Sequence, residues 1–171
     1  MKTKNLITLA LLSAISIILT RFFSVMLPIG GIMGLRISFG DIPIILAGIL
    51  FGPIAGALVG AVSDVIGAVF LSAFGYFPGF TLSAALVGAI PPLVLKIFRG
   101  KELKLQHIFI AILVTDIVTS LFLNTLWLTM MTGKAFLILL PPRLIARAIL
   151  LPITTSLIYI LNKKVKVLKL I

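Results

Sequence analysis

The sequence predicts an all-α, polytopic membrane protein: a compact bundle of six transmembrane helices with both termini in the cytoplasm. Three observations predict this fold class. Of the 171 residues, 61% are hydrophobic and 11% are charged, whereas about 25% are charged in an average soluble domain. Apolar runs of about 20 residues, the length that crosses a bilayer, follow one another with little polar sequence between them. Basic residues collect in alternate connections. We expect one transmembrane domain over residues 1–171.

The positive-inside rule assigns both termini to the cytoplasm. Six spans put the two ends of the chain on one side of the membrane, and the segments on that side carry ten of the fifteen basic residues. Membrane orientation and anionic headgroups therefore explain the net charge of +11 better than nucleic-acid binding does. We expect a multi-pass protein of the cell membrane, surrounded by the lipid bilayer, with no nucleic-acid partner.

The first predicted helix covers residues 5–27. We interpret it as a transmembrane span rather than a signal peptide, because the apolar run over residues 10–27 is too long and has no clean cleavage site. Ala10 and Ala14 form an AxxxA pattern one turn apart, a spacing that lets two helix backbones approach closely, whether inside the bundle or against a partner. Arg21 lies near the outer end of this helix.

A loop is predicted over residues 28–34, where glycine and proline break the helix. Its glycines are Gly30, Gly31 and Gly34, and most of its other residues are apolar. A flexible apolar loop at the membrane surface suits a lid over a cavity, and it equally suits a segment that lies at the lipid interface.

The second predicted helix, residues 41–50, is short for a full span, and a Phe-Gly-Pro turn separates it from a third helix that ends near residue 72. One narrow stripe of the third helix has a member at every fourth position: Gly52, Gly56, Gly60, Asp64 and Ala68. Residues at this spacing share one face, and small residues draw helices together. Asp64 is therefore predicted to face neighbouring helices and not lipid.

The fourth and fifth helices are predicted over residues 80–96 and 107–131. Tyr76 lies in an aromatic turn before the fourth helix, and Thr81 lies in its first turn. The fifth helix carries polar residues at successive four-residue steps: Asp116, Ser120 and Asn124. Trp127 lies on nearly the same face as Asn124, so this face is predicted to be polar and aromatic.

Four of the five outer basic residues are arginines: Arg21, Arg36, Arg143 and Arg147. An arginine at a helix centre costs about 2.5–3.5 kcal/mol on insertion scales, so such residues pair, line a cavity or extend to the membrane surface. Arg143 and Arg147 lie one turn apart, behind two prolines, on a sixth helix predicted over residues 136–161. Because guanidinium groups bind carboxylates through two parallel hydrogen bonds, converging arginines indicate an anion site.

The other candidate residues complement this anion site. Asp64 accepts hydrogen bonds, Asn124 donates and accepts them, and Tyr76 and Trp127 offer aromatic faces for stacking. Together with Thr81, they suit a ligand that has a flat heteroaromatic head with N–H donors and an anionic tail. Alternatively, Asp64 forms an internal salt bridge with an arginine.

Enzyme chemistry is not indicated. The chain has no cysteine, which excludes thiolate metal sites and thiol nucleophiles, and it has one histidine. No GxSxG or HExxH motif is present, and Gly133 and Lys134 lack the preceding glycine of a phosphate-binding loop. We expect no enzyme activity, no cofactor and no metal; ATP-driven transport would need an ATPase on another chain.

Several motifs together resemble one known family. The six short spans, the AxxxA pattern, and the runs FGDIPIILAGILFGPIAGALVGAVSDVIG and YFPGFTLSAALVG are similar to the S components of energy-coupling-factor (ECF) vitamin transporters, most of all the folate-specific members. The resemblance implies a transmembrane substrate-binding domain that captures its vitamin outside the cell. It also implies docking on an ECF module, which consists of a transmembrane coupling protein and two cytoplasmic ATPases. Ala10 and Ala14 would contact the coupling protein, and residues 28–34 would be the gate.

Folate also fits the candidate residues. Its pterin offers donors to Asp64 or Asn124 and a face to Trp127 or Tyr76, and its glutamate carboxylates match arginine. We expect Arg143 and Arg147 to hold the glutamate, with Arg21 or Arg36 assisting. Since Arg21 lies seven residues after the docking motif, on nearly the same face, the helix must bend or the two functions must lie at different depths.

Two other interpretations remain open at the level of the sequence. One is an S component for another vitamin, such as riboflavin or a queuosine precursor. The other is a non-transport bundle subunit or small channel, in which the polar residues form only helix contacts.

Overall fold

Five long helical segments, one short helix and a β-hairpin build the described part of the chain. The computed structural model describes residues 3–29, 32–71, 75–98 and 103–167, and only the backbone of residues 26–29, 32–36 and 166–167. Five helical segments are long and apolar enough to cross a membrane. Four of them are α1 (Thr3–Arg21), α3 (Pro53–Leu71), α4 (Pro78–Leu95) with the 3₁₀ segment η1 (Lys96–Phe98), and α7 (Phe136–Val167). The fifth is the segment Leu105–Thr132, whose parts are described below. The shorter α2 (Asp41–Phe51) has 11 residues. The predicted helical membrane bundle is confirmed.

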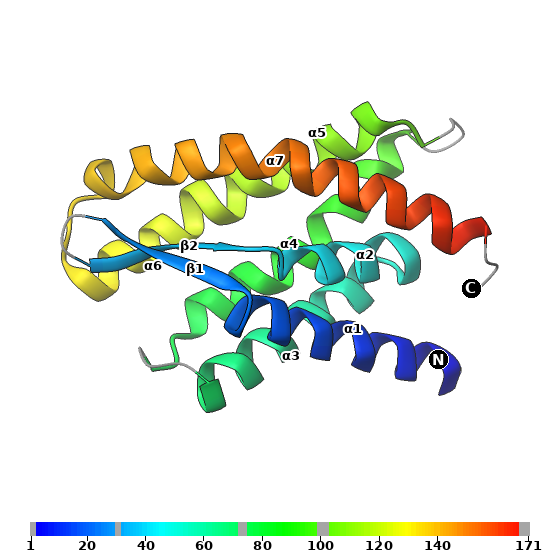
Figure 1. The fold of residues 1–171 in the computed structure, drawn as a ribbon, viewed down its shortest axis with the longest axis horizontal. Helices are drawn as coiled ribbons and strands as arrows, with labels where there is room; N and C mark the ends of the chain where they lie inside the picture. Colours follow the sequence, from blue (N-terminus) through cyan, green and yellow to red (C-terminus); the bar gives the residue numbers. More distant parts are fainter. Residues whose placement is uncertain (1–2, 30–31, 72–74, 99–102, 168–171) are drawn as a thin grey trace.

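The start of α1 and the end of α7 lie at the same end of the bundle (Figure 1). This arrangement agrees with an even number of passes through the membrane. That this end faces the cytoplasm stays a prediction.

A β-hairpin replaces the predicted end of the first helix and the predicted loop. α1 ends at Arg21, six residues earlier than expected, and the antiparallel strands β1 (Ser24–Ile29) and β2 (Ile32–Ser38) follow. The expectation of a loop over residues 28–34 was therefore wrong for its described residues. β-branched residues such as Val25 and Ile37 favour strands, and pairing two strands satisfies the backbone groups that a loop in an apolar setting would leave unpaired. The register shifts after Leu27, next to Pro28, which has no N–H to donate.

The predicted fifth helix is not a regular α-helix. It consists of α5 (Leu105–Asp116), a π-helical segment η2 (Ile117–Leu123) and α6 (Asn124–Thr132). The backbone N–H of Asn124 donates to the carbonyl of Thr119, five residues back. Since a π-turn holds more residues than an α-turn, the predicted four-residue steps from Asp116 to Asn124 do not form one straight stripe.

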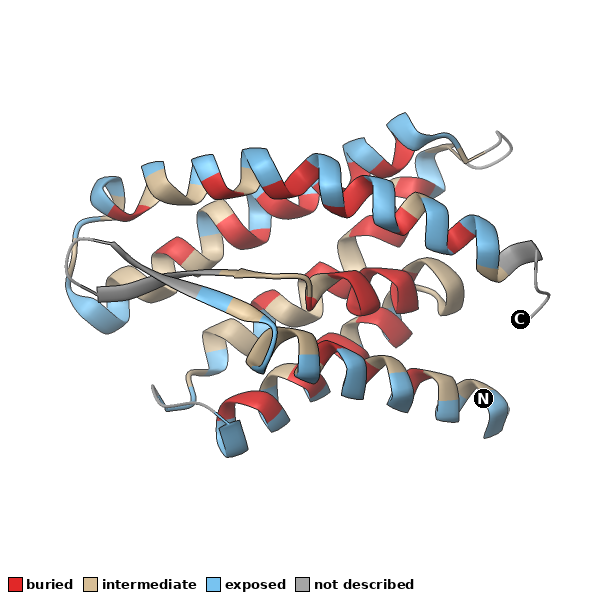
Figure 2. Ribbon diagram, in the orientation of Figure 1, coloured by how far each residue is buried: buried red, intermediate tan, exposed pale blue. Residues whose placement is uncertain are grey.

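Glycines let α2, α3 and α4 pack backbone to backbone, as the predicted stripe on the third helix required. A Cβ atom at Gly56 would lie 2.6 Å from the Cα of Gly48, and one at Gly60 would lie 2.6 Å from the carbonyl carbon of Ala84. Gly52 differs from the rest of the stripe because it ends α2 with a positive φ of 98°. Figure 2 shows the buried faces of the helices turned inwards.

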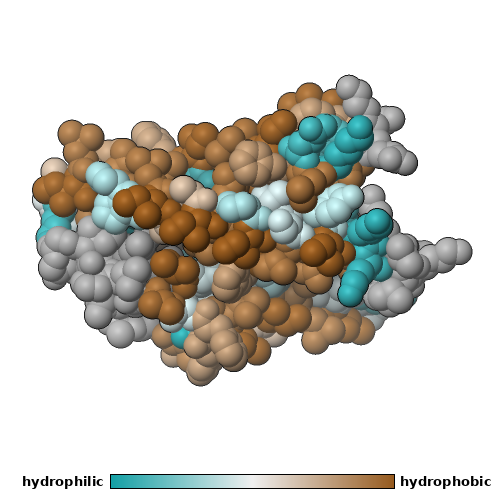
Figure 3. Space-filling view, turned by 45° about the horizontal axis from the view of Figure 1, so that its top comes forward, coloured by the Kyte–Doolittle hydropathy of each residue, from teal (hydrophilic) through white to brown (hydrophobic). Residues whose placement is uncertain are grey.

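The outer surface is mostly apolar. Figure 3 shows hydrophobic side chains over most of one face, with hydrophilic ones gathered near the end that carries the termini. Long side chains such as Ile54, Phe70, Leu137 and Ile145 are exposed on two different helices, α3 and α7. A soluble protein rarely exposes so much apolar surface, whereas a lipid-facing surface requires it.

Candidate functional site

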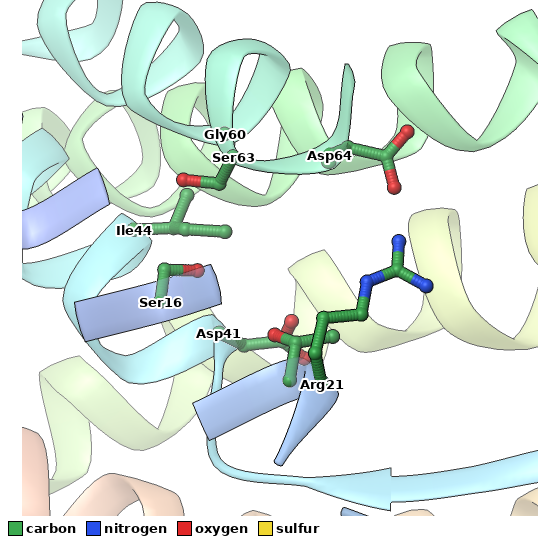
Figure 4. A pocket seen from close by; sticks show the side chains of 9 residues that line it. Ser16, Arg21, Asp41, Ile44, Gly60, Ser63 and Asp64 are labelled. Carbon is green, nitrogen blue, oxygen red and sulfur yellow. The ribbon is translucent and has the colours of Figure 1, made fainter. Parts of the chain in front are cut away.

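A polar cavity of about 80 Å³ lies where the end of α1 meets α2, α3 and α4 (Figure 4). It is lined by Ser16, Thr20, Arg21, Asp41, Ile44, Gly60, Ser63, Asp64 and Ala84. Three of these side chains are ionisable and come from three helices. Sites for drug-sized ligands usually measure about 300–1,000 Å³, so the cavity has room for one end of such a ligand.

Two serine hydroxyls hold α1 against the other walls of this cavity. Ser16 donates to the carbonyl of Gly40, 2.8 Å away, and Ser63 donates to the carbonyl of Ser13, 3.3 Å away. Both serines are buried. Such hydrogen bonds satisfy polar groups that cannot bond to water within a bilayer.

Arg21 enters the cavity from the last residue of α1. Its guanidinium points towards the carboxylate of Asp64 (Figure 4). Gly67 makes room for it, because a Cβ atom there would lie 2.8 Å from Nε of Arg21. Ala10 and Ala14 are exposed on α1 at seven or more residues before Arg21, which is about 10 Å or more along the helix axis. Arg21 and the alanine motif thus lie at different depths, which removes the conflict that their shared face suggested.

Asp64 lies at the end of the α3 glycine stripe and accepts a hydrogen bond from α4. The Thr81 hydroxyl donates to its Oδ2 over 2.8 Å, and the hydroxyl oxygens of Thr81 and Tyr76 lie 3.2 Å apart. A threonine hydroxyl has one hydrogen, which the carboxylate takes, so the Tyr76 hydroxyl is the donor in the second contact. The predicted grouping of Asp64, Tyr76 and Thr81 is thus present as a hydrogen-bonded chain.

Arg147 bridges two carboxylates from two other helices. Its Nη1 lies 3.2 Å from Oδ2 of Asp41, in the first turn of α2, and 3.1 Å from Oδ1 of Asp116, at the end of α5. The positive end of the α2 dipole also favours a carboxylate at Asp41. Because Asp41 lines the cavity as well, the ion-pair cluster and the cavity are continuous. The sequence-based candidates did not include Asp41; its signal was a carboxylate within an apolar helix.

Arg143 lies one turn before Arg147 and contacts the π-helical segment. Its Nη1 donates to the carbonyl of Ser120 over 3.1 Å. The nearby Asn124 has a buried Oδ1 without a hydrogen-bond partner in the described part of the chain. A buried acceptor of this kind is suited to a donor on a ligand.

Trp127 lies against the N-terminal half of α4. Its Nε1 donates to Oγ of Ser83 over 3.0 Å, and its ring lies 6.0 Å from that of Phe77, centroid to centroid. Ser83 and Thr81 are two residues apart on α4 and therefore point about 200° apart. Ala84, which lines the cavity, lies between these two directions. Asp64 and Trp127 thus approach the buried face of α4 from opposite flanks.

The remaining candidates lie in or near the hairpin. Arg36 pairs with Met26 in the β-ladder, and only its backbone is described. Gly34 lies on β2. Gly30 and Gly31 lie outside the described residues.

Comparisons with known proteins agree on one family. The family "ECF transporter, substrate-specific component" matches residues 4–162. The folate transporter FolT of Clostridium novyi (strain NT) is 39% identical over 158 residues, which cover 92% of this chain and 87% of the relative. FolT of Leuconostoc mesenteroides subsp. mesenteroides is 29% identical over 169 residues, which cover 95% of this chain and 87% of the relative.

Solved structures extend this similarity to the fold. A crystal structure of FolT bound with folic acid superposes with a TM-score of 0.81 at 35% identity and covers 96% of this chain and 95% of that chain. The S component of a bacterial ECF transporter superposes with a TM-score of 0.71 at 27% identity and covers 99% of both chains. The chain belongs to the family of substrate-specific components of ECF transporters.

Proposed function

We propose that this protein binds folate and delivers it as the substrate-binding subunit of an ECF-type importer. The observation that carries the proposal is the polar cavity between membrane-spanning helices, lined by Arg21, Asp41 and Asp64. Ionisable residues that face a cavity inside a membrane indicate a substrate or ion pathway. The relatives described as folate transporters, and the FolT structure bound with folic acid, support folate as the ligand. As a member of this transporter family with several apolar helices, the chain is a multi-pass protein of the cell membrane.

The chemistry of folate matches the side chains around the cavity. The pterin head is flat and carries N–H donors, which the Asp64 carboxylate or the buried Oδ1 of Asn124 can accept. The indole of Trp127 and the phenol of Tyr76 offer stacking faces. The cavity would hold one end of folate, and the rest would extend along α4.

We propose that arginine binds the glutamate end of folate and that Arg143 makes the main contact. A guanidinium has five N–H donors, so its bond to the Ser120 carbonyl is compatible with bidentate binding of a carboxylate. Arg147 already bridges two aspartates, so its contribution is to hold α7 in place and to supply positive charge. Arg21 from α1 or Arg36 from β2 would assist.

Folate binding by the purified protein tests this proposal. Titration calorimetry should detect folate binding, with riboflavin and biotin as competitors that fail to displace it. Arg143→Ala should weaken folate binding by about 10- to 100-fold, the loss expected for charge-assisted hydrogen bonds. Lys134→Ala is the matched control, because it removes an outer basic residue that we do not assign to the site. If Arg143→Ala binds folate as tightly as the parent, Arg143 is not part of the site. If riboflavin displaces folate, the assignment of folate as the ligand is wrong.

The partners follow from the same proposal. The chain itself would catalyse no reaction; a transmembrane coupling protein and two cytoplasmic ATPases would drive transport, and the hairpin around Gly34 would gate the site. Ala10 and Ala14 are exposed on α1, where small side chains allow close approach of another helix. Replacing both with tryptophan should abolish transport in proteoliposomes containing the ECF module and leave folate binding intact. Ala148→Trp, at an exposed alanine of α7, is the control. Unchanged transport in the double variant would place docking elsewhere.

A further inference from the structure

We propose that Gly79 and Ser83 of α4 are positioning residues, which hold the indole of Trp127 in the orientation that stacks on the ligand. This inference rests on the proposed folate function. It concerns two residues that contact Trp127 and that the sequence pattern did not single out.

Ser83 sets the rotation of the indole within its own plane. Its side chain is buried, with 2% of its surface exposed, and its Oγ accepts the hydrogen bond from Nε1 of Trp127 over 3.0 Å. An indole has one N–H donor, and a partly buried tryptophan usually finds a partner for it. Since this donor is engaged by Ser83, the contribution of Trp127 to binding is the face of its ring.

Gly79 decides which face of the indole is covered. A Cβ atom at Gly79 would lie 2.6 Å from Cδ2 and 2.8 Å from Cε2 of Trp127, the two carbons that its rings share. Contact at these central atoms means that the ring lies flat over Gly79, where any side chain would push it away. The opposite face of the indole is thus the one that a flat ligand can stack on.

Neighbouring aromatic rings complete the arrangement. A Cβ atom at Gly79 would also lie 2.6 Å from Cε1 of Phe77. Phe77 is tilted by 51° to Trp127, and it packs edge-on against Phe80 at 5.9 Å. Gly79 and Ser83 lie one helical turn apart on the same flank of α4, so one rigid helix supplies both constraints.

The test uses the fact that Trp127 is the single tryptophan of the chain. Acrylamide quenching of its emission, measured without ligand, reports how well the indole is held, and calorimetry reports folate affinity. Ser83→Ala should raise quenching and weaken folate binding about threefold to tenfold, the effect of one lost hydrogen bond. Gly79→Ala should do the same, and Ser83→Thr, which keeps the hydroxyl, should restore both. Ser156→Ala, at an exposed serine of α7, is the control.

Each result decides the proposal. Parental folate affinity in Ser83→Ala and Gly79→Ala overturns it, whatever the quenching, because Trp127 would then only pack α6 against α4. Weaker binding with unchanged quenching also overturns it, since the indole would not have moved. If Gly79→Ala does not fold, Ser83→Ala and its rescue decide alone. If the parent protein does not bind folate, the proposed function is refuted. If the parent binds folate and the variants bind it equally well, only the positioning role of Gly79 and Ser83 is refuted.

Discussion

Replacing Gly60 with alanine should separate α3 from α4 at the level of the polar cavity. The added Cβ atom would lie 2.6 Å from the carbonyl carbon of Ala84 and 3.2 Å from the backbone nitrogen of Ala85. Ordinary contact begins at 3.4 Å, and the Ala84 carbonyl oxygen would lie closer still to the new Cβ atom, so the helices must move apart by at least about 0.8 Å at this point. The neighbouring hydrogen bond from Thr81 to Asp64, now 2.8 Å, spans the same interface and would be stretched beyond bonding distance.

The magnitude follows from two opposing terms. Alanine is a better helix former than glycine by about 0.5–1 kcal/mol, which favours the variant. Overpacking of a tight interface costs typically about 1–3 kcal/mol, and here the obstacle is backbone, which cannot rotate away. We expect net destabilisation by about 1–2 kcal/mol, a fall in Tm of roughly 2–8 °C for a chain of this size, and weaker folate binding through Asp64.

Thermal unfolding in detergent, monitored by the emission of Trp127, measures the fall in Tm. Calorimetry measures the loss of folate affinity. A second substitution sharpens the test. Ala84→Gly removes the Ala84 methyl and leaves the backbone atoms that obstruct the new Cβ, so Gly60→Ala combined with Ala84→Gly should not recover stability. An unchanged or higher Tm for Gly60→Ala, or its rescue by Ala84→Gly, would refute the backbone-contact argument.

Two further predictions concern the charged residues. Arg147→Met should destabilise the protein by about 3–5 kcal/mol, because it leaves the carboxylates of Asp41 and Asp116 without their shared cation. Replacing Asp41 and Asp116 with asparagine in the same variant should recover most of the lost stability. If Arg147→Met alone is as stable as the parent in thermal unfolding, the bridge adds no stability. Gly67→Ala should change stability by less than about 1 kcal/mol, because the flexible Arg21 side chain can move. It should nevertheless weaken folate binding in calorimetry, and unchanged affinity would remove the Arg21 guanidinium from the site.

The sequence predicted much of the fold because the relevant signals are local. Apolar length marked the spans, and the four-residue spacing of glycines on α3 correctly indicated a face that packs against neighbouring helices. The hairpin was missed because Gly30, Gly31 and Gly34 suggested a loop, and the pairing of Ser24 with Ser38 depends on two segments meeting. The π-helical segment η2 was missed because its signature lies in backbone hydrogen bonding and not in residue types.

The candidate site was predictable in kind and only partly in detail. An intramembrane aspartate on a glycine stripe and four arginines indicated a polar pocket, and the described cavity contains Arg21 and Asp64. The two roles predicted for Asp64, contact with a ligand and an internal interaction with an arginine, do not exclude each other. Its carboxylate faces Arg21 and also lines the cavity. Family membership leaves the non-transport bundle without support.

Composition, span length and small-residue spacing by themselves determined that this protein is a packed helical membrane bundle with ionisable groups inside it. Those properties depend on residues a few positions apart, which share a helix face or a span whatever the rest of the chain does. Only the tertiary structure decided which charges meet, because partners such as Arg147 and Asp41 are 106 residues apart. It likewise decided that Trp127 rests on Ser83 and Gly79, 44 and 48 positions before it, since that contact requires the particular crossing of α6 with α4. The order and rotation of helices, including the change of phase at η2, set these long-range contacts, and no local spacing encodes them.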